Sequence, residues 1–284
     1  MAPPEARTVV SKHRDHLRIL VLETDEPHPD TQREKGSFGE VMNELFEEAG
    51  EAHEPKLGIE TLMMYAVEPD GGRIPNAGEI GEDIHAILIT GSVYDAHSDE
   101  EWVMKLLRLI RDIRFTGICF GHQILCRALG SEVRPQRDNE WELSHTRLTL
   151  SDVGRKLFNI PYSEPPHIHL HEMHLDKVVA PPDPTQTDLL RDDAEVHVWA
   201  TSDHTEVQGV YIHKRMFTTQ GHMEFDEKMV RRQLEMRVES GTLEEGDAAE
   251  AEERAEWMHD GLVVAKAVLR FFHGDDDAAG VIRP

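Results

Sequence analysis

Residues 117–123, with the sequence GICFGHQ, combine a nucleophilic side chain with the small residues that a sharp turn requires. Cys119 follows a short apolar run typical of a buried strand and precedes a helical pattern. Gly117 and Gly121 flank it at two residues on either side, which lets a strained turn form and a substrate approach. A thiol at a helix N-terminus is stabilised as thiolate. The segment predicts a nucleophile elbow, although a buried cysteine in an ordinary strand–helix turn has the same spacing.

A histidine and a glutamate form a second candidate motif in residues 220–225, QGHMEF. His222 and Glu224 lie two positions apart, so an extended backbone places both side chains on one side. A base with its orienting carboxylate would complete a triad with a cysteine nucleophile. H-x-E alone is a weak signal in a chain with 18 histidines.

A third candidate is the end of the strand predicted over residues 84–92, where the sequence reads TGS. Backbone N–H groups of Gly91 or Ser92, together with that of Phe120, would form an oxyanion hole beside the thiol. A strand that ends in a glycine turn is common, so this motif gains weight only with the other two.

Together, G-x-C-x-G-x-Q, the later H-x-E and the upstream glycine turn resemble the class I glutamine amidotransferases, in particular their stand-alone GMP-synthase-like branch. The resemblance covers roughly residues 17–230. It implies that Cys119 is the nucleophile, His222 the base and acid, and Glu224 the carboxylate that orients His222. It also implies that Gln123 helps to hold the substrate side of the pocket.

The resemblance extends to an H-x-D-x-V motif that begins at His174 and flanks the active site in that branch. Two positions depart from the family pattern. Met223 stands where the family's commonest H-P-E ending has proline, and Ser144 lies in the W-E-x-G segment where many members have glycine. The first change is expected to leave the triad intact, whereas the second lies where the preference for the acyl donor is set.

The implied reaction is cysteine-dependent hydrolysis of a γ-glutamyl amide, either glutamine or a γ-glutamyl peptide, through a thioester, with no metal or organic cofactor. One alternative is an amidotransferase that supplies ammonia to a separate acceptor synthase in specialised, or secondary, metabolism. A third is an inactive binding or regulatory module. The intact Cys119, His222 and Glu224 argue against the third.

Strand and helix patterns alternate in the first half, which predicts an α/β fold with a central, mostly parallel, flavodoxin-like sheet flanked by helices. The second half is richer in strands. The strands are expected at 17–25, 59–67, 84–92, 144–150, 167–175, 195–203 and within 207–221, and the helices at 38–49, 99–113, 226–239 and 253–272, with strand, turn and helix over 115–130.

We expect a flexible lead over residues 1–16 and one domain over residues 17–284 with an acidic helical C-terminal part. Within that part, residues 239–256 are strongly acidic and are interpreted as a solvated insertion or helix extension, with a partner contact as the less favoured reading.

The 55 acidic and 30 basic residues give a formal charge of −25, which argues against nucleic-acid binding and against anionic membranes. The polar N-terminus and the lack of an apolar run of about 20 residues predict a soluble cytoplasmic protein. Two cysteines are too few for a disulfide framework.

One histidine-rich segment suggests a metal cluster, because His167, His169 and His171 would share one face of a strand. His174 is already assigned to the family motif and no cysteine joins the group, so we expect no metal site. Cys126 is interpreted as a small core residue.

Overall fold

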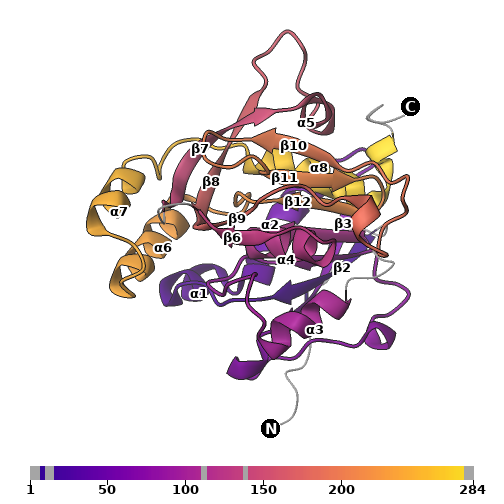
Figure 1. The fold of residues 1–284 in the computed structure, drawn as a ribbon, viewed down its shortest axis with the longest axis horizontal. Helices are drawn as coiled ribbons and strands as arrows, with labels where there is room; N and C mark the ends of the chain where they lie inside the picture. The colour runs from indigo at the N-terminus through magenta and orange to yellow at the C-terminus, as the bar shows by residue number, and fades with distance from the viewer. Residues whose placement is uncertain (1–6, 10–15, 110–113, 137–139, 278–284) are drawn as a thin grey trace.

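A ten-stranded sheet forms the centre of the computed structural model, which describes residues 7–9, 16–109, 114–136 and 140–277 (Figure 1). The strand order is β1-β3-β2-β4-β5-β12-β11-β10-β7-β8, and β6 pairs with β9 in a small second sheet. The strands are β1 (Arg7–Val9), β2 (His16–Glu23), β3 (Gly58–Tyr65), β4 (Ala86–Ile89), β5 (Arg114–Ile118), β6 (Val133–Pro135), β7 (Glu142–Leu150), β8 (His167–His174), β9 (Asp176–Val178), β10 (His197–Thr201), β11 (Gly209–Ile212) and β12 (Met216–Thr219).

The middle of the large sheet is parallel and its two sides are antiparallel. Strands β3, β2, β4, β5 and β12 run parallel, whereas β1 and the series β11, β10, β7 and β8 pair antiparallel. The helices are α1 (Pro29–Lys35), α2 (Phe38–Glu51), α3 (Glu101–Leu109), α4 (Phe120–Ala128), α5 (Asp152–Leu157), α6 (Glu227–Glu239), α7 (Glu245–Glu252) and α8 (Gly261–His273). The prediction of a mostly parallel sheet flanked by helices, with a strand-rich second half, is confirmed.

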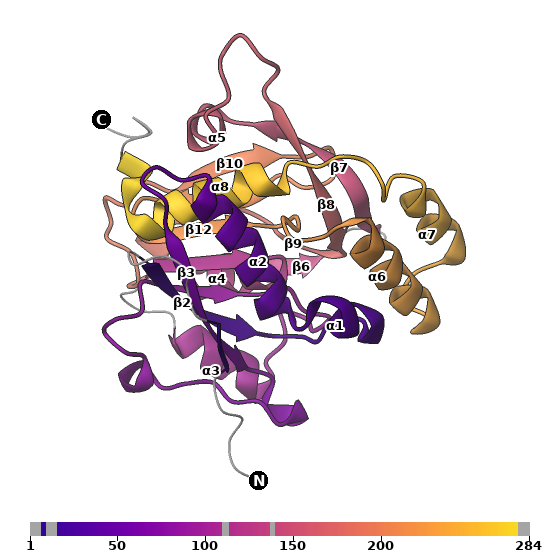
Figure 2. The same cartoon turned by 180° about the vertical axis from the view of Figure 1, so that it is seen from behind.

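Side chains alternate across the sheet and separate two apolar layers. In β2, Ile19 and Val21 pack in the layer that contains α2 and α8, while Leu20 and Leu22 pack in the layer that contains α3 and α4. Figures 1 and 2 show these helix pairs on opposite faces. A parallel strand buried on both faces needs apolar residues at consecutive positions, which is why residues 17–22 read as an uninterrupted apolar run apart from Arg18.

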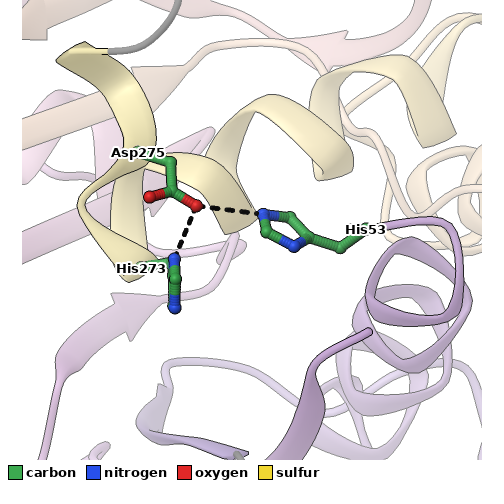
Figure 3. Close-up of side chains that lie close together, drawn as sticks. All are labelled: His53, His273 and Asp275. Atoms are coloured by element: carbon green, nitrogen blue, oxygen red, sulfur yellow. Dashed lines mark hydrogen bonds and ion pairs between the residues drawn. The ribbon is translucent and has the colours of Figure 1, made fainter. Parts of the chain in front are cut away.

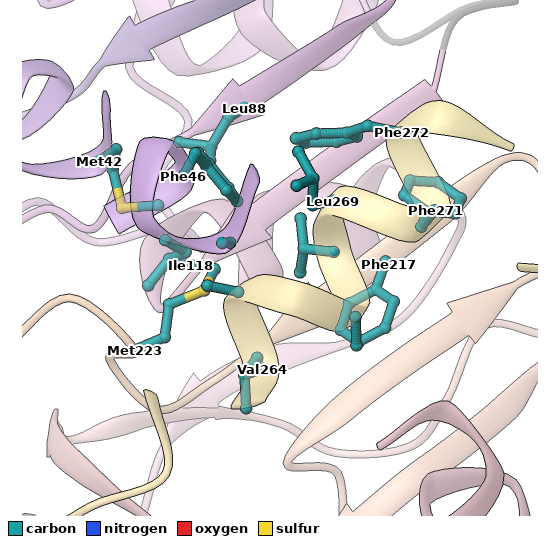
Figure 4. Close-up of a cluster of buried hydrophobic side chains, with 14 of the residues drawn as sticks. Met42, Phe46, Leu88, Ile118, Phe217, Met223, Val264, Leu269, Phe271 and Phe272 are labelled. Atoms are coloured by element: carbon teal, nitrogen blue, oxygen red, sulfur yellow. The ribbon is translucent and has the colours of Figure 1, made fainter. Parts of the chain in front are cut away.

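The α2–α8 layer supports the segment that carries His222. Phe46 of α2 and Phe272 of α8 lie with ring centroids 5.7 Å apart, and the cluster continues past Val264 to Met223 and Ile118 (Figure 4). Met223 is 1% exposed, so its side chain anchors this segment in the core.

A third apolar cluster joins α6 and α7 to the body through Phe38, Met173 and Phe225. The helix expected over 253–272 begins only at Gly261, so its first eight expected residues were assigned wrongly. The reason is a pairing at the edge of the sheet. Asp260 N donates to His169 O, and Asp260 Oδ2 accepts from His169 N, both at 2.8 Å. These bonds fix Asp260 against β8 at the start of the helix, and residues 253–256 form turns before it.

Within the expected N-terminal lead, Arg7–Val9 forms a short strand antiparallel to β3, and His16 begins β2. The other residues of that lead lie outside the described residues, as do the last four of the helix expected over 99–113. Among the helices described, none has the length and apolar character needed to span a bilayer.

Ser144 adopts a left-handed backbone conformation with φ 60°, at the position where the family resemblance expects glycine. Its hydroxyl is buried and has no hydrogen-bond partner in the part of the chain that the structure describes. We expect Ser144→Gly to raise the free energy of unfolding by about 1 kcal/mol, because glycine adopts positive φ without the Cβ clash. Urea unfolding measures the change. The control is Ser151→Gly, where the serine has φ −71° and caps α5, so stability should fall by a few tenths of a kcal/mol. A loss of stability at position 144 would contradict the prediction.

Candidate functional site

Cys119 occupies the strand–turn–helix predicted from the sequence, between β5 and α4, with φ 50° and ψ −104°. The turn is closed by backbone packing that only glycine permits. A Cβ on Gly117 would lie 2.3 Å from the Gly121 carbonyl, and a Cβ on Gly121 would lie 2.2 Å from Ile89 O. Gly121 N donates to Thr90 O at 3.2 Å, which ties the elbow to the end of β4. The thiol is therefore held in a strained position at the N-terminus of a helix.

The parallel pairing of β5 with β12 brings His222 to this elbow. Thr219 is in register with Ile118, and Cys119 N donates to Thr219 O at 2.9 Å. Both strands end at the same edge of the sheet, so His222, three residues after Thr219, lies beside the thiol. His222 N donates to His171 O at 2.8 Å, which fixes the segment from the other side.

His222 and Glu224 are hydrogen-bonded despite the methionine between them, with Nδ1 2.8 Å from Oε1. The Phe225 ring stacks on the imidazole at a centroid distance of 3.9 Å. Burial opposes protonation of His222, but the charge of Glu224 and hydrogen bonds to Cys119 and Glu224 outweigh it and raise its pKa to about 10. The imidazole is thus held as a proton donor between a thiol and a carboxylate.

The glycine turn after β4 lies against the same two residues. A Cβ on Gly91 would lie 2.9 Å from His222 Cε1 and 3.6 Å from Cys119 Cβ. The Ser92 hydroxyl donates to Thr24 O at 2.6 Å, so Ser92 fixes the loop through its side chain. In the described part of the chain, the N–H groups of Gly91 and Phe120 donate no hydrogen bond. They are therefore available to an oxyanion at the thiol.

A cavity of about 470 Å³ opens at Cys119, within the usual size range of small-molecule sites. A much smaller one, about 20 Å³, lies against the thiol on the side of His222 and Glu224. The large cavity is lined by side chains from the elbow, the end of β8 and the α6–α7 segment: Ser92, Val93, Tyr94, Asp95, Cys119, Gln123, Trp141, Met173, His174, Leu175, Asp176, Arg237, Gly241, Thr242, Glu244 and Asp247.

Gln123 and His174, both expected in substrate binding, line the cavity but are engaged within the protein. Gln123 Nε2 donates to Asp176 O at 2.8 Å and to Gln220 Oε1 at 3.1 Å. His174 Nδ1 lies 2.9 Å from Asp176 O, and its Nε2 lies 3.1 Å from Glu142 Oε2. Both side chains thus hold elements together at the cavity wall.

The sequence interpretation missed the buried acidic groups that support this wall. His174 Nε2 also lies 3.3 Å from Glu172 Oε2, so its ring is enclosed by two carboxylates. Burial raises the pKa of Glu172 to about 7, and its carboxylate lies where a Cβ on Gly221 would meet it at 2.4 Å. The single available signal was a glutamate at an inward position of an otherwise alternating strand, His167–His174.

The α6–α7 segment also contributes to the site, which its acidic composition did not indicate. Glu244 and Asp247 line the large cavity, and Arg237 lines both cavities beside Cys119. The stretch interpreted as a solvated insertion forms α7 and one wall of the site.

His167, His169 and His171 do lie along β8, but not in a metal-binding arrangement. Among the described residues, the groups whose ligand atoms approach within 4.8 Å do not include any of these three. One such group, His53, His273 and Asp275, joins the ends of α2 and α8 (Figure 3). Both histidines already contact the Asp275 carboxylate, His53 through Nε2 and His273 through Nδ1, and His53 Nδ1 contacts Pro55 O.

Comparison with known proteins matches residues 63–235 of the chain to the family model Glutamine amidotransferase class-I. A glutamine amidotransferase-like protein of Schizosaccharomyces pombe is 26% identical over 260 residues, covering 89% of this chain and 97% of the relative. Gamma-glutamyl peptidase 4 of Arabidopsis thaliana is 26% identical over 204 residues, covering 70% of this chain and 73% of the relative. The crystal structure of a glutamine amidotransferase from Thermotoga maritima superposes with a TM-score of 0.63 at 18% identity, covering 91% of this chain and 99% of that chain.

The packing at the elbow predicts that Gly121→Ala lowers the free energy of unfolding by about 2–4 kcal/mol, because the added methyl group collides with the Ile89 carbonyl. Urea unfolding measures the loss. The control is Gly246→Ala in α7, where an added Cβ meets nothing within 4 Å, so stability should stay level or rise by up to about 1 kcal/mol. Equal effects of the two substitutions would contradict the packing argument.

The lowered pKa of His171 predicts that the folded protein loses stability in acid. Burial, with the nearby His259, His145 and His222, lowers its pKa to about 3 from an ordinary 6.5. Between these values the unfolded state binds a proton that the folded state does not, so stability falls as the pH falls below about 6.5, at up to about 1.4 kcal/mol per pH unit. His171→Gln should therefore lose less stability between pH 7.5 and pH 5 than the wild type. His204→Gln, at an exposed position, serves as the control in urea unfolding at both pH values. A wild-type slope in His171→Gln would refute the assignment.

Proposed function

Because this chain belongs to the class I glutamine amidotransferase family, we propose that it is an amide hydrolase in which Cys119, His222 and Glu224 cleave a γ-glutamyl amide through a thioester. The observation that carries the proposal is the meeting of the three residues at one edge of the sheet. Cys119 stands in the elbow after β5, and His222, hydrogen-bonded to Glu224, follows β12 beside it. Similarity to a named gamma-glutamyl peptidase supports the choice of a γ-glutamyl amide as substrate class.

The first step is attack by the Cys119 sulfur on the side-chain amide carbon of the γ-glutamyl group. The carbonyl oxygen becomes an oxyanion, held by the N–H groups of Phe120 and of Gly91 or Ser92. The His222 imidazolium then donates its proton to the leaving nitrogen, the C–N bond breaks, and ammonia or an amine departs.

The second step is hydrolysis of the thioester. Neutral His222 takes a proton from water, which attacks the acyl carbon, and the collapse of this second oxyanion breaks the C–S bond and releases glutamate. Glu224 accepts the Nδ1–H bond throughout, so it fixes the tautomer and stabilises the charged imidazole.

The proposal is tested by incubating the wild type and Cys119→Ala separately with glutamine, glutathione and a glutathione S-conjugate. We expect the wild type to release glutamate from at least one of them and the variant to lose at least about 10³-fold in rate, since the nucleophile is gone. Glutamate is measured in every reaction, and ammonia in the glutamine reaction. Hydroxylamine should trap the acyl group of the wild type as the γ-glutamyl hydroxamate.

Cys126→Ala is the matched control, because this second thiol is fully buried in the α4 layer and burial raises its pKa. It should retain wild-type rates. Release from the peptides alone would define a γ-glutamyl peptidase, whereas release from glutamine alone would favour ammonia supply to an acceptor synthase. Equal rates for the wild type and Cys119→Ala with every substrate would overturn hydrolysis by this chain acting alone.

A further inference from the structure

Arg237, near the end of α6, presents an unused cation to the cavity at Cys119. It lines both the large cavity and the small one. Its guanidinium packs over the Trp141 ring at 5.3 Å, and its Nε is buried with no hydrogen-bond partner among the described residues. Every other described arginine that is not solvent-exposed has a hydrogen bond or an ion pair from its guanidinium.

A partly buried guanidinium without such a partner is costly, since burial removes water and nothing replaces it. Burial accordingly lowers the pKa of Arg237, while Cys119, Asp25 and Asp95 oppose that shift through their charge alone. Trp141 is itself held in place by a bond from its Nε1 to Thr242 O. The donor is thus positioned by packing and left open on the side of the cavity.

The charged residues that line the large cavity indicate which class of ligand could bind the Arg237 guanidinium. Among the described residues that line the large cavity, Arg237 is the only lysine or arginine, and the acidic side chains of the lining are Asp95, Asp176, Glu244 and Asp247. The imidazole of His174 is already enclosed by two glutamates. A carboxylate entering the cavity therefore has one cation to pair with, whereas a positively charged group has several acidic ones.

We propose, on the basis of the proposed function, that Arg237 binds the α-carboxylate of the γ-glutamyl group. In such a group three carbons separate the α-carboxylate from the carbon that the thiol attacks. A carboxylate site must then share a cavity with Cys119, as Arg237 does. A guanidinium and a carboxylate form paired, charge-assisted hydrogen bonds, which suits a planar donor with no other partner.

The test compares each donor with its α-carboxamide. We measure kcat/KM for whichever of glutamine and glutathione the wild type hydrolyses, and for the same compound with its glutamyl α-carboxylate converted to the carboxamide. The wild type should prefer the carboxylate by about 10- to 100-fold, the range for a charged hydrogen bond. Arg237→Gln should lose about the same factor on the parent substrate, and its preference should fall to within about threefold of unity. Arg237→Lys should recover part of the preference.

The matched control is Arg231→Gln on the same helix, whose guanidinium pairs with Glu227 and Glu252 away from the cavity. It should keep the wild-type preference. The rate of Cys119 alkylation by iodoacetamide, which has no carboxylate, should be similar in the wild type and Arg237→Gln, and shows that the site is folded.

An undiminished preference for the carboxylate in Arg237→Gln would overturn the proposal. A loss of alkylation rate with the preference intact would also overturn it and would assign Arg237 to the thiolate instead. A wild type that hydrolyses none of glutamine, glutathione and the glutathione S-conjugate would overturn the proposed hydrolysis by this chain acting alone. In that case, protection of Cys119 from alkylation by glutamate, and its loss in Arg237→Gln, tests the carboxylate site without turnover.

Discussion

The parallel pairing of β5 with β12 is the constraint on which the rest of the site depends. Its four register pairs run from Met216 with Phe115 to Thr219 with Ile118. Because side chains alternate along a strand, a slip of one residue would turn every inward residue of β12 outward and displace His222 from the thiol. The antiparallel strands β7, β8, β10 and β11 lie between β5 and β12 in the sequence. Their pairing in the sheet therefore positions β12 next to β5.

A buried cluster of ionisable side chains also supports the segment that carries His222. The side chains of His174, Glu142 and Glu172 are at most 2% exposed, and Glu172 lies against Gly221, directly before His222. Burial opposes protonation of His174, but hydrogen bonds to both glutamates outweigh it and raise its pKa well above the usual value. Burying three ionisable groups brings little net stability. Their effect here is to fix the position of the backbone that carries His222.

The net charge of the chain is negative, whereas the side chains nearest Cys119 include cations. The chain carries a formal charge of −25, and acidic side chains surround much of the cavity. Two cations nevertheless lie beside the Cys119 thiol, the His222 imidazole with its raised pKa and the guanidinium of Arg237. The net charge therefore disfavours binding of polyanions at the surface of this protein. The local charge around the thiol is set by a few buried contacts.

The family, the fold class and the elbow were readable from the sequence because they depend on local chemistry. The glycines around Cys119 are required by contacts within a few residues or with the adjacent strand, and buried parallel strands show as apolar runs. Strand and helix boundaries were less predictable, as at Gly261, where two hydrogen bonds between Asp260 and His169 of β8 fix the start of α8.

Only the tertiary structure decided how residues far apart in the chain share the site. Nothing local marks Glu172 or Arg237, since a glutamate in a strand and an arginine in a charged helix are ordinary residues. Their roles arise from burial beside Gly221 and Cys119, which the packing of β8 and α6 creates. The types of side chain and their short-range spacing thus determined the chemistry available to this protein, and long-range packing decided which charges surround it, because burial and pairing are properties of the folded chain.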